Sequence, residues 1–167
     1  MSPDESVSIE ETVGLLLRES GKTIATAEST AGGYIGHLLN NVPGSSKYYI
    51  GSIVAYHSRP KQTLLNVPEH LFKDVGSVSV QVTLAMAQGV RNALDTDIGV
   101  SETGIAGPTG GNPEHPIGTV FIAISTRDGY ELAERHVFDQ GRSEFKERTA
   151  EAVFDLVRHY LRRKPAS

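Results

Sequence analysis

The stretch TIATAESTAGGYIGHLL, residues 23–39, decides the fold. Its first five residues predict a short buried strand, and apolar residues then repeat at helical spacing from residue 34 to residue 39. A strand, a turn of small residues and a helix, in that order, form a typical ligand-binding corner of an α/β protein. Ser29 or Thr30 is expected to cap the helix.

Helical and strand patterns alternate on both sides of this stretch. Ser8 begins a capping box and Gly21 suits the end of the helix that follows. Further strands are expected at 48–57, 97–101, 117–126 and 130–138, and further helices within 61–75, from Ser77 or Ser79 to about Leu94, and at 143–163. Asp128-Gly129 is a hairpin signal between the last two strands. This order predicts one domain over residues 1–167, with a core at about 8–162, built as a three-layer α/β/α sandwich with a mixed sheet.

Composition narrows the classes of function. The chain has 167 residues, enough for one core, and its net charge of -4 argues against a non-specific nucleic-acid binder. The acidic N-terminus lacks the apolar region of a signal peptide, and no apolar run reaches the ~20 residues of a membrane helix, so we expect a cytoplasmic protein without a membrane partner. With no cysteine and six scattered histidines, no metal site is predicted.

Two glycine-rich stretches, 28–33 and 103–111, each follow a predicted strand. Glycine lets backbone N–H groups approach a ligand closely, and such groups at a helix start favour an anion. The loops therefore suit a phosphate or phosphoribosyl group, although the glycines can also serve only to make tight turns. Neither loop has the pattern of a P-loop or of a dinucleotide-binding turn.

Ser46 and Lys61 are candidates for a nucleophile and its base. A serine hydroxyl needs a neighbouring base, and a neutral lysine performs this task in several hydrolases. A continuous strand would separate the two residues by roughly 50 Å, so the pair requires the chain to reverse, for which Gly51 offers a break. The alternative is a capping Ser46, a core-edge Tyr56 and a solvated Lys61.

Eight segments together resemble the nicotinamide-nucleotide amidohydrolase family, which is also the C-terminal domain of the competence/damage-inducible CinA proteins. These segments are AESTAGG (27–33), PGSSKYY (43–49), GSIVAYHSRPK (51–61), LLNVP (64–68), GSVS (76–79), TGIAGPTGG (103–111), PIGTVFIA (116–123) and FDQGR (138–142). The motif TGIAGP, followed by GG and then by PxGTV, is the most specific part of the resemblance. The resemblance covers the chain from about residue 8 to residue 162.

The resemblance implies a deamidase that hydrolyses nicotinamide mononucleotide to the acid and ammonia, in pyridine nucleotide recycling. It implies Ser46 as nucleophile, with Tyr56 and Lys61 in support, in an α/β/α sandwich that forms a homodimer and needs neither a metal nor another cofactor. Expected ligands of the phosphoribosyl group are Ser29, Thr30, Gly32, Gly33, Thr103, Gly104, Gly107 and Gly111. Arg142 is expected to pair with the phosphate or to form a structural salt bridge.

The chain departs from the family pattern at Ala31, Val80 and His115, where a threonine, a glutamate and a lysine are usual. These departures motivate an alternative, a catalytically weak or inactive nucleotide-binding module of the same fold. Because the first helix has its own cap, we expect the chain to stand alone rather than as part of a fusion.

Overall fold

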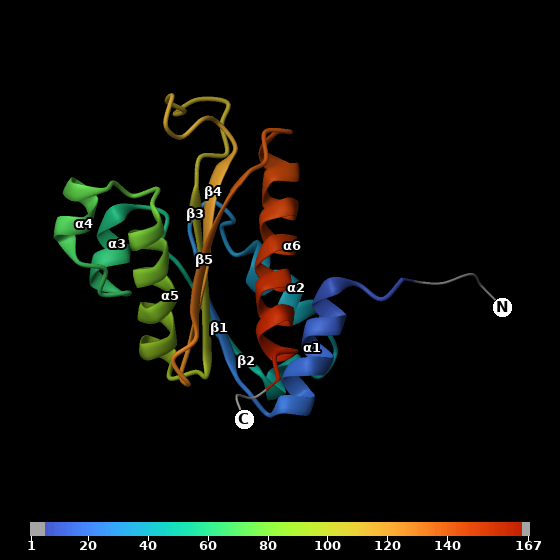
Figure 1. Ribbon diagram of the computed structural model, residues 1–167. Coiled ribbons are helices and arrows are strands. Elements are labelled where there is room, and N and C mark those ends of the chain that lie inside the picture. Colours follow the sequence, from blue (N-terminus) through green and yellow to red (C-terminus); the bar gives the residue numbers. More distant parts are fainter. Residues whose placement is uncertain (1–5, 165–167) are drawn as a thin grey trace.

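The computed structural model describes residues 6–164 and contains one five-stranded sheet, ordered β2-β1-β3-β4-β5 (Figure 1). The strands are β1 (Ile24–Glu28), β2 (Tyr49–Val54), β3 (Ile98–Gly104), β4 (Thr119–Thr126) and β5 (Glu131–Val137). The first three are parallel, whereas β4 runs antiparallel to both of its neighbours. The predicted mixed sheet is confirmed. The outermost parts of the predicted domain, residues 1–5 and 165–167, lie outside the described residues.

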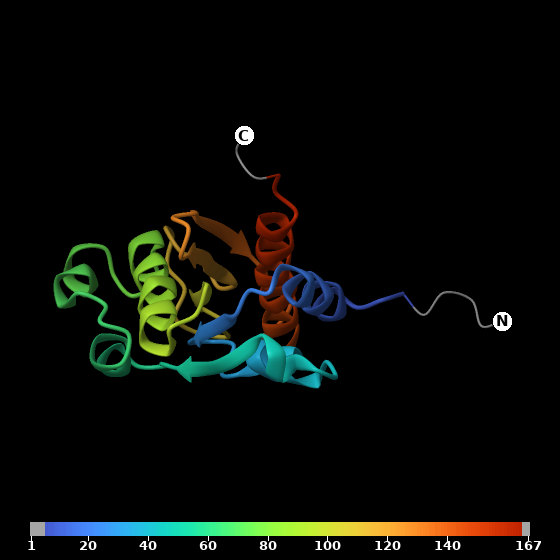
Figure 2. The same cartoon turned by 90° about the horizontal axis from the view of Figure 1, so that it is seen from below.

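Helices cover both faces of the sheet, which makes the three layers visible in Figures 1 and 2. One face carries α1 (Ile9–Ser20), α2 (Tyr34–Asn41) and α6 (Arg142–Leu161), and the other carries α3 (Ser58–Thr63), α4 (Glu69–Asp74) and α5 (Val80–Leu94). Each face has its own apolar cluster. Ile24 belongs to the cluster beneath α1, α2 and α6, while Ala25 belongs to the cluster beneath α5. Side chains therefore alternate between the two layers along β1.

Several local predictions are confirmed. Ser8 and Glu11 form the complete capping box of α1, and Gly21 ends that helix with a left-handed φ of 69°. Ser79 caps α5 by accepting a hydrogen bond from the amide of Val82. The turn between β4 and β5 contains Gly129, also at positive φ, as the Asp-Gly signal predicts.

Two local predictions are wrong. The residue before α2 is Gly33, and no side chain of the cap residue bonds the helix, so neither Ser29 nor Thr30 is its cap. The chain also does not reverse at Gly51. It continues straight through β2, where Gly51 pairs with Ala25 of β1.

The connections place a topological switch point between β1 and β3. From β1 the chain passes through α2 to β2 at the edge, and it then returns through α3, α4 and α5 on the other face to β3. The segments that leave β1 and β3 therefore diverge in opposite directions. In open α/β sheets, ligands bind at such a point, beyond the carboxyl ends of the strands. Residues 29–33 and 105–118 begin there.

Close packing of α5 on β3 gives a first prediction. A Cβ added to Gly99 in β3 would lie 2.2 Å from the carbonyl oxygen of Ala87 and 2.8 Å from Cβ of Arg91. We expect Gly99→Ala to lower the free energy of unfolding by about 1–3 kcal/mol, because helix and strand must separate to admit the methyl group. Urea denaturation measures this change.

The matched control is Gly51→Ala in β2, where the nearest atom to the added Cβ is Cδ1 of Leu94 at 3.5 Å, an ordinary contact. This variant is expected to stay within about 1 kcal/mol of the wild type. An equal loss of stability in both variants would contradict the prediction.

Candidate active site

Ser29 and Lys61 meet at the carboxyl ends of β1 and β2. Ser29 is the first residue after β1 and is 5% exposed, whereas Lys61 lies in α3, the first helix after β2, and is 1% exposed. The Nζ atom of Lys61 donates to Oγ of Ser29 over 3.1 Å, and also to the carbonyl oxygen of Tyr56 over 3.1 Å. Two adjacent strands thus deliver a serine and a buried amine to one place.

Burial gives Lys61 the properties of a base. Removal from water lowers the pKa of Lys61 below its ordinary value, and the negative charge of Glu102 partly opposes this effect. A lowered pKa increases the fraction of neutral amine at neutral pH. A neutral amine next to a serine hydroxyl can accept its proton, which is the activation that a serine nucleophile requires.

The backbone around Ser29 is held by Glu102, a fully buried carboxylate at the end of β3. It accepts hydrogen bonds from the amide of Ser29 over 2.5 Å, the amide of Ala31 over 2.9 Å and Oγ1 of Thr30 over 2.5 Å. Burial raises the pKa of Glu102, while these three donors act in the opposite direction. The carboxylate therefore lies directly beneath the turn that carries the serine.

A second buried carboxylate, Glu28, stands beside Glu102 because Ala27 and Ser101 are partners in the β1–β3 register. Glu28 accepts hydrogen bonds from three amides at the start of α2, those of Gly33, Ile35 and Gly36, over 2.9–3.1 Å. The helix thus obtains its cap from a strand residue and not from the turn. Oγ1 of Thr26 is a fourth donor to Glu28, at 2.8 Å.

The structure does not bring Ser46 and Lys61 together within the chain. Ser46 is exposed in the short helix η1 (Ser45–Lys47), which precedes β2, whereas Lys61 follows β2. Six residues of continuous strand, about 20 Å, lie between the two. The fold-back that the predicted pair needed does not form, and Ser29 takes the place of Ser46 beside the lysine. Tyr56 is 65% exposed and reaches Lys61 with its carbonyl oxygen rather than its ring.

The second glycine loop, residues 103–111, is tightly packed against Ile117 and Thr119, which follow it in the chain. Added Cβ atoms at three of its glycines would lie 2.5–2.7 Å from Thr119 or Ile117, as found for Gly104, Gly107 and Gly111. Packing against these two residues therefore favours glycine at all three positions. Oγ1 of Thr103 donates to the carbonyl oxygen of Ser77 over 3.4 Å. Contact of this loop with a ligand stays a prediction.

Two cations on α6 lie near the two glycine-rich loops. Nη1 of Arg142, the first residue of α6, donates to the carbonyl oxygen of Gly107 over 2.8 Å and so ties the second loop to the helix. One turn later, Nζ of Lys146 lies 3.9 Å from the position that a Cβ on Gly32 would occupy. Lys146 was not among the predicted site residues. The available signal was its i,i+4 spacing from Arg142, which places the two on one side of the helix.

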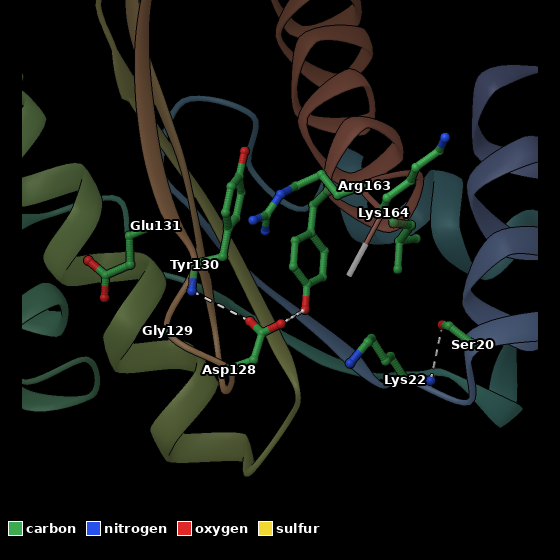
Figure 3. A pocket seen from close by; sticks show the side chains of 10 residues that line it. Ser20, Lys22, Asp128, Gly129, Tyr130, Glu131, Arg163 and Lys164 are labelled. Carbon is green, nitrogen blue, oxygen red and sulfur yellow. Dashed lines mark hydrogen bonds between the residues drawn. The ribbon is translucent and has the colours of Figure 1, made fainter. Parts of the chain in front are cut away.

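A cavity of about 710 Å³ lies at the other end of the sheet, between the β4–β5 turn and the end of α6 (Figure 3). The hydroxyl of Tyr160 donates to Asp128 over 3.0 Å, and the ring of Tyr160 stacks on that of Tyr130 with 5.2 Å between their centroids. Cζ of Arg163 lies over the ring of Tyr130, 4.2 Å from its centroid. Lys22, which also lines this cavity, precedes β1, whereas Ser29 follows it. The cavity is therefore separate from the Ser29 turn.

Metal-binding clusters and membrane-spanning helices are both absent from the described residues. Across residues 6–164, the side chains of His, Asp and Glu form no group of three that could hold a metal ion. Within the same range, every helix is too short or too polar to cross a membrane.

The fold and this site together define an α/β protein with a serine–lysine pair at the switch point of its sheet. Residues 6–161 match the family model of the CinA C-terminal domain, and the chain belongs to that family. A CinA-like protein of Salinibacter ruber is 48% identical over 156 residues, which cover 93% of this chain and 37% of that protein. One from a Sulfurihydrogenibium strain is 43% identical over 159 residues, 95% of this chain and 39% of that protein. The chain thus spans less than two fifths of these relatives.

Solved structures show the same architecture. The competence/damage inducible protein CihA of Agrobacterium tumefaciens is 30% identical, with a TM-score of 0.87 over 98% of this chain and 100% of that chain. A CinA superfamily protein of Klebsiella pneumoniae, 24% identical over 92% of this chain and 95% of that chain, has a TM-score of 0.88 and shows the fold alone.

The buried lysine predicts a pH-dependent difference in stability. Because the pKa of Lys61 is lower in the folded than in the unfolded chain, the unfolded chain binds more protons between the two values, and stability rises with pH there. We expect the free energy of unfolding of the wild type, minus that of Lys61→Met, to increase as the pH rises from neutral towards about 10. Urea denaturation of both proteins across this range provides the measurement, and a pH-independent difference would refute the shifted pKa.

Proposed function

We propose that this chain is a serine amidohydrolase that converts nicotinamide mononucleotide to the acid and ammonia, with Ser29 as nucleophile and Lys61 as base. The 3.1 Å contact between Nζ of Lys61 and Oγ of Ser29, both buried, carries the proposal. The chemistry follows from this pair. The substrate rests on the resemblance to nicotinamide-nucleotide amidohydrolases, and the family match supports it only at the level of a CinA domain.

The reaction uses one proton carrier. Neutral Lys61 accepts the proton of Ser29 as Oγ attacks the carboxamide carbon, and the resulting ammonium returns that proton to the departing nitrogen. Ammonia leaves and an acyl-enzyme ester remains. Lys61 then takes a proton from water, whose oxygen attacks the ester, and Ser29 regains its proton as the acid product departs. The carbonyl oxygen of Tyr56 holds the amine in place between these steps.

The amide of Thr30 is the candidate donor for the oxyanion. The neighbouring amides are occupied, because those of Ser29 and Ala31 donate to Glu102, and that of Gly32 donates to the carbonyl oxygen of Ser29. Within the described residues, the Thr30 amide donates no hydrogen bond. In hydrolases whose nucleophile lies on a strand–turn–helix corner, the residue after the nucleophile supplies such a donor. One donor of this kind is worth about 3 kcal/mol.

Arg142 and Lys146 are the proposed ligands of the substrate phosphate. Both are cations on the first turns of α6, where the helix dipole also favours an anion. Lys146 lies near Gly32, next to the serine turn, and Arg142 bonds the second glycine loop. Binding the remote phosphate would hold the carboxamide near Ser29 and raise the rate by fixing its orientation.

A pair of serine variants tests the nucleophile. We expect the wild type to release ammonia from nicotinamide mononucleotide, and Ser29→Ala to lower kcat by at least about 10³-fold, because Ser29 carries the one side-chain hydroxyl to which Lys61 donates within residues 6–164. Ser46→Ala, at an exposed position about one strand away, is the matched control and should keep most of the activity. Ammonia release at a series of substrate concentrations is the measurement.

Three other outcomes would contradict the proposed nucleophile, its place within one chain, or catalysis itself. Undiminished activity of Ser29→Ala would exclude Ser29 as nucleophile, and loss of activity in Ser46→Ala alone would mean that the partner subunit supplies Ser46. A wild type that binds the nucleotide stoichiometrically in calorimetry, without releasing ammonia, would instead be the non-catalytic module.

We further propose a cytoplasmic homodimer, as the resemblance implies. The β2 edge of the sheet supports this, since it carries two half-exposed apolar residues on one face, Ile50 at 50% and Val54 at 48%. Light scattering at micromolar concentration should give the mass of two chains, and Ile50→Lys should shift it towards one. A monomeric wild type would contradict the dimer, and a dimeric Ile50→Lys would exclude this edge as its interface.

A further inference from the structure

We infer that Glu102 is the positioning residue of the proposed active site, because its buried carboxylate accepts hydrogen bonds from the amides of Ser29 and Ala31 and from Oγ1 of Thr30. The inference rests on the proposed serine–lysine chemistry. It extends that chemistry from Ser29, just after β1, and Lys61, in α3, to a third residue, on β3, which touches neither the substrate nor the reacting atoms.

The hydrogen bonds of Glu102 lie on both sides of the Thr30 amide, the proposed oxyanion donor. Glu102 bonds the amide of Ser29 and the amide of Ala31, and these two amides flank that of Thr30. The third bond, from Oγ1 of Thr30, fixes the intervening side chain. Both the nucleophile and the proposed oxyanion donor are thus held relative to β3. A displacement of about 1 Å in such a group can cost 10²-fold in rate.

Burial and the charge of Glu102 act in opposite directions on the pKa of Lys61. Burial lowers the pKa of Lys61 and favours the neutral base, whereas Glu102 raises it and keeps the amine basic enough to take a proton. Of the charges on the described residues, Glu102 from β3 is the one that shifts the pKa of Lys61, and it raises that pKa. The other buried acid, Glu28 from β1, acts on Glu102 and raises its pKa.

Glu28 provides a matched control for Glu102. The two residues have the same side chain, are both fully buried and stand side by side on adjacent strands. The amides that Glu28 accepts from belong to Gly33, Ile35 and Gly36, beyond the serine turn. A general effect of losing a buried carboxylate should therefore appear in both variants, and an effect on the serine–lysine pair only at Glu102.

The experiment compares the pH dependence of kcat/KM for the wild type, Glu102→Gln and Glu28→Gln. In Glu102→Gln the maximal rate should fall about 10- to 100-fold, and the acid limb should move to lower pH, because Lys61 loses the charge that raises its pKa. Glu28→Gln should lower the melting temperature and leave the acid limb in place. An unmoved acid limb in Glu102→Gln, or an equal shift in Glu28→Gln, overturns the inference.

A second readout does not depend on the substrate. A fluorophosphonate forms an Oγ–P bond with an activated serine, fluoride leaves, and the serine proton passes to Lys61. Intact-mass measurement of the labelling rate against pH should show the same shift of the acid limb in Glu102→Gln. Labelling without ammonia release would therefore reject nicotinamide mononucleotide as substrate and still test Glu102.

Glu102→Asp distinguishes the effect of the hydrogen bonds of Glu102 from the effect of its charge. It also serves as a second test variant if Glu102→Gln does not fold. The shorter side chain keeps the charge and withdraws from the amides, so labelling should slow while the acid limb stays near that of the wild type. Labelling of Glu102→Asp at the wild-type rate would overturn the positioning role of these hydrogen bonds.

Discussion

The site depends on the burial of two carboxylates, Glu28 and Glu102, side by side at the ends of β1 and β3. A buried carboxylate without partners would cost many kcal/mol. Here four donors meet Glu28 and three meet Glu102, most of them backbone amides of the turn and first helical residues that follow β1. Those amides would otherwise lack acceptors, because the start of a helix leaves its N–H groups unpaired. The turn and the carboxylates thus satisfy each other.

The same burial determines the chemistry of the lysine. Lys61 lies in the low-dielectric region that the sheet and α3 create, so its charged form is disfavoured and its amine becomes available as a base. Removing a cation from water opposes folding, and such a residue persists because the apolar layers on both faces of the sheet stabilise the chain independently of it. Burial of Lys61 thus lowers stability at the candidate site, while it favours the neutral amine that the proposed reaction needs.

Much of the fold was predictable because its signals are local. The capping box at Ser8, the Asp-Gly hairpin and the strand–turn–helix corner at residues 23–39 each follow from neighbouring residues, and their sum gives the layers of the sandwich. Lys61 and the Ser29 turn were also recognised as functional. The partner of Lys61 was not, because proximity along the chain favoured Ser46, whereas β2 keeps those residues at its opposite ends.

The residues missed by the sequence analysis depend on tertiary register. Nothing in the local sequence around Glu102 indicates that it will lie beneath Ser29, since this follows from the pairing of β1 with β3 across more than seventy residues. The cap of α2 was assigned to Ser29 or Thr30 by a sound local rule. That rule failed because a buried strand residue, Glu28, could reach three helix amides at once.

Strand order explains why the site forms where it does. The strand order β2-β1-β3 places the carboxyl ends of three strands next to one another. Each end contributes one residue of the site: Lys61 just after β2, Ser29 just after β1 and Glu102 within β3. Parallel pairing is essential, because an antiparallel neighbour would present its amino end at the same edge. Because α2 and α5 make their crossovers on opposite faces of the sheet (Figures 1 and 2), the turn that carries Ser29 lies at the switch point between β1 and β3. The topology that stabilises the sheet is thus the same feature that brings together Lys61, Ser29 and Glu102, the proposed base, nucleophile and positioning residue.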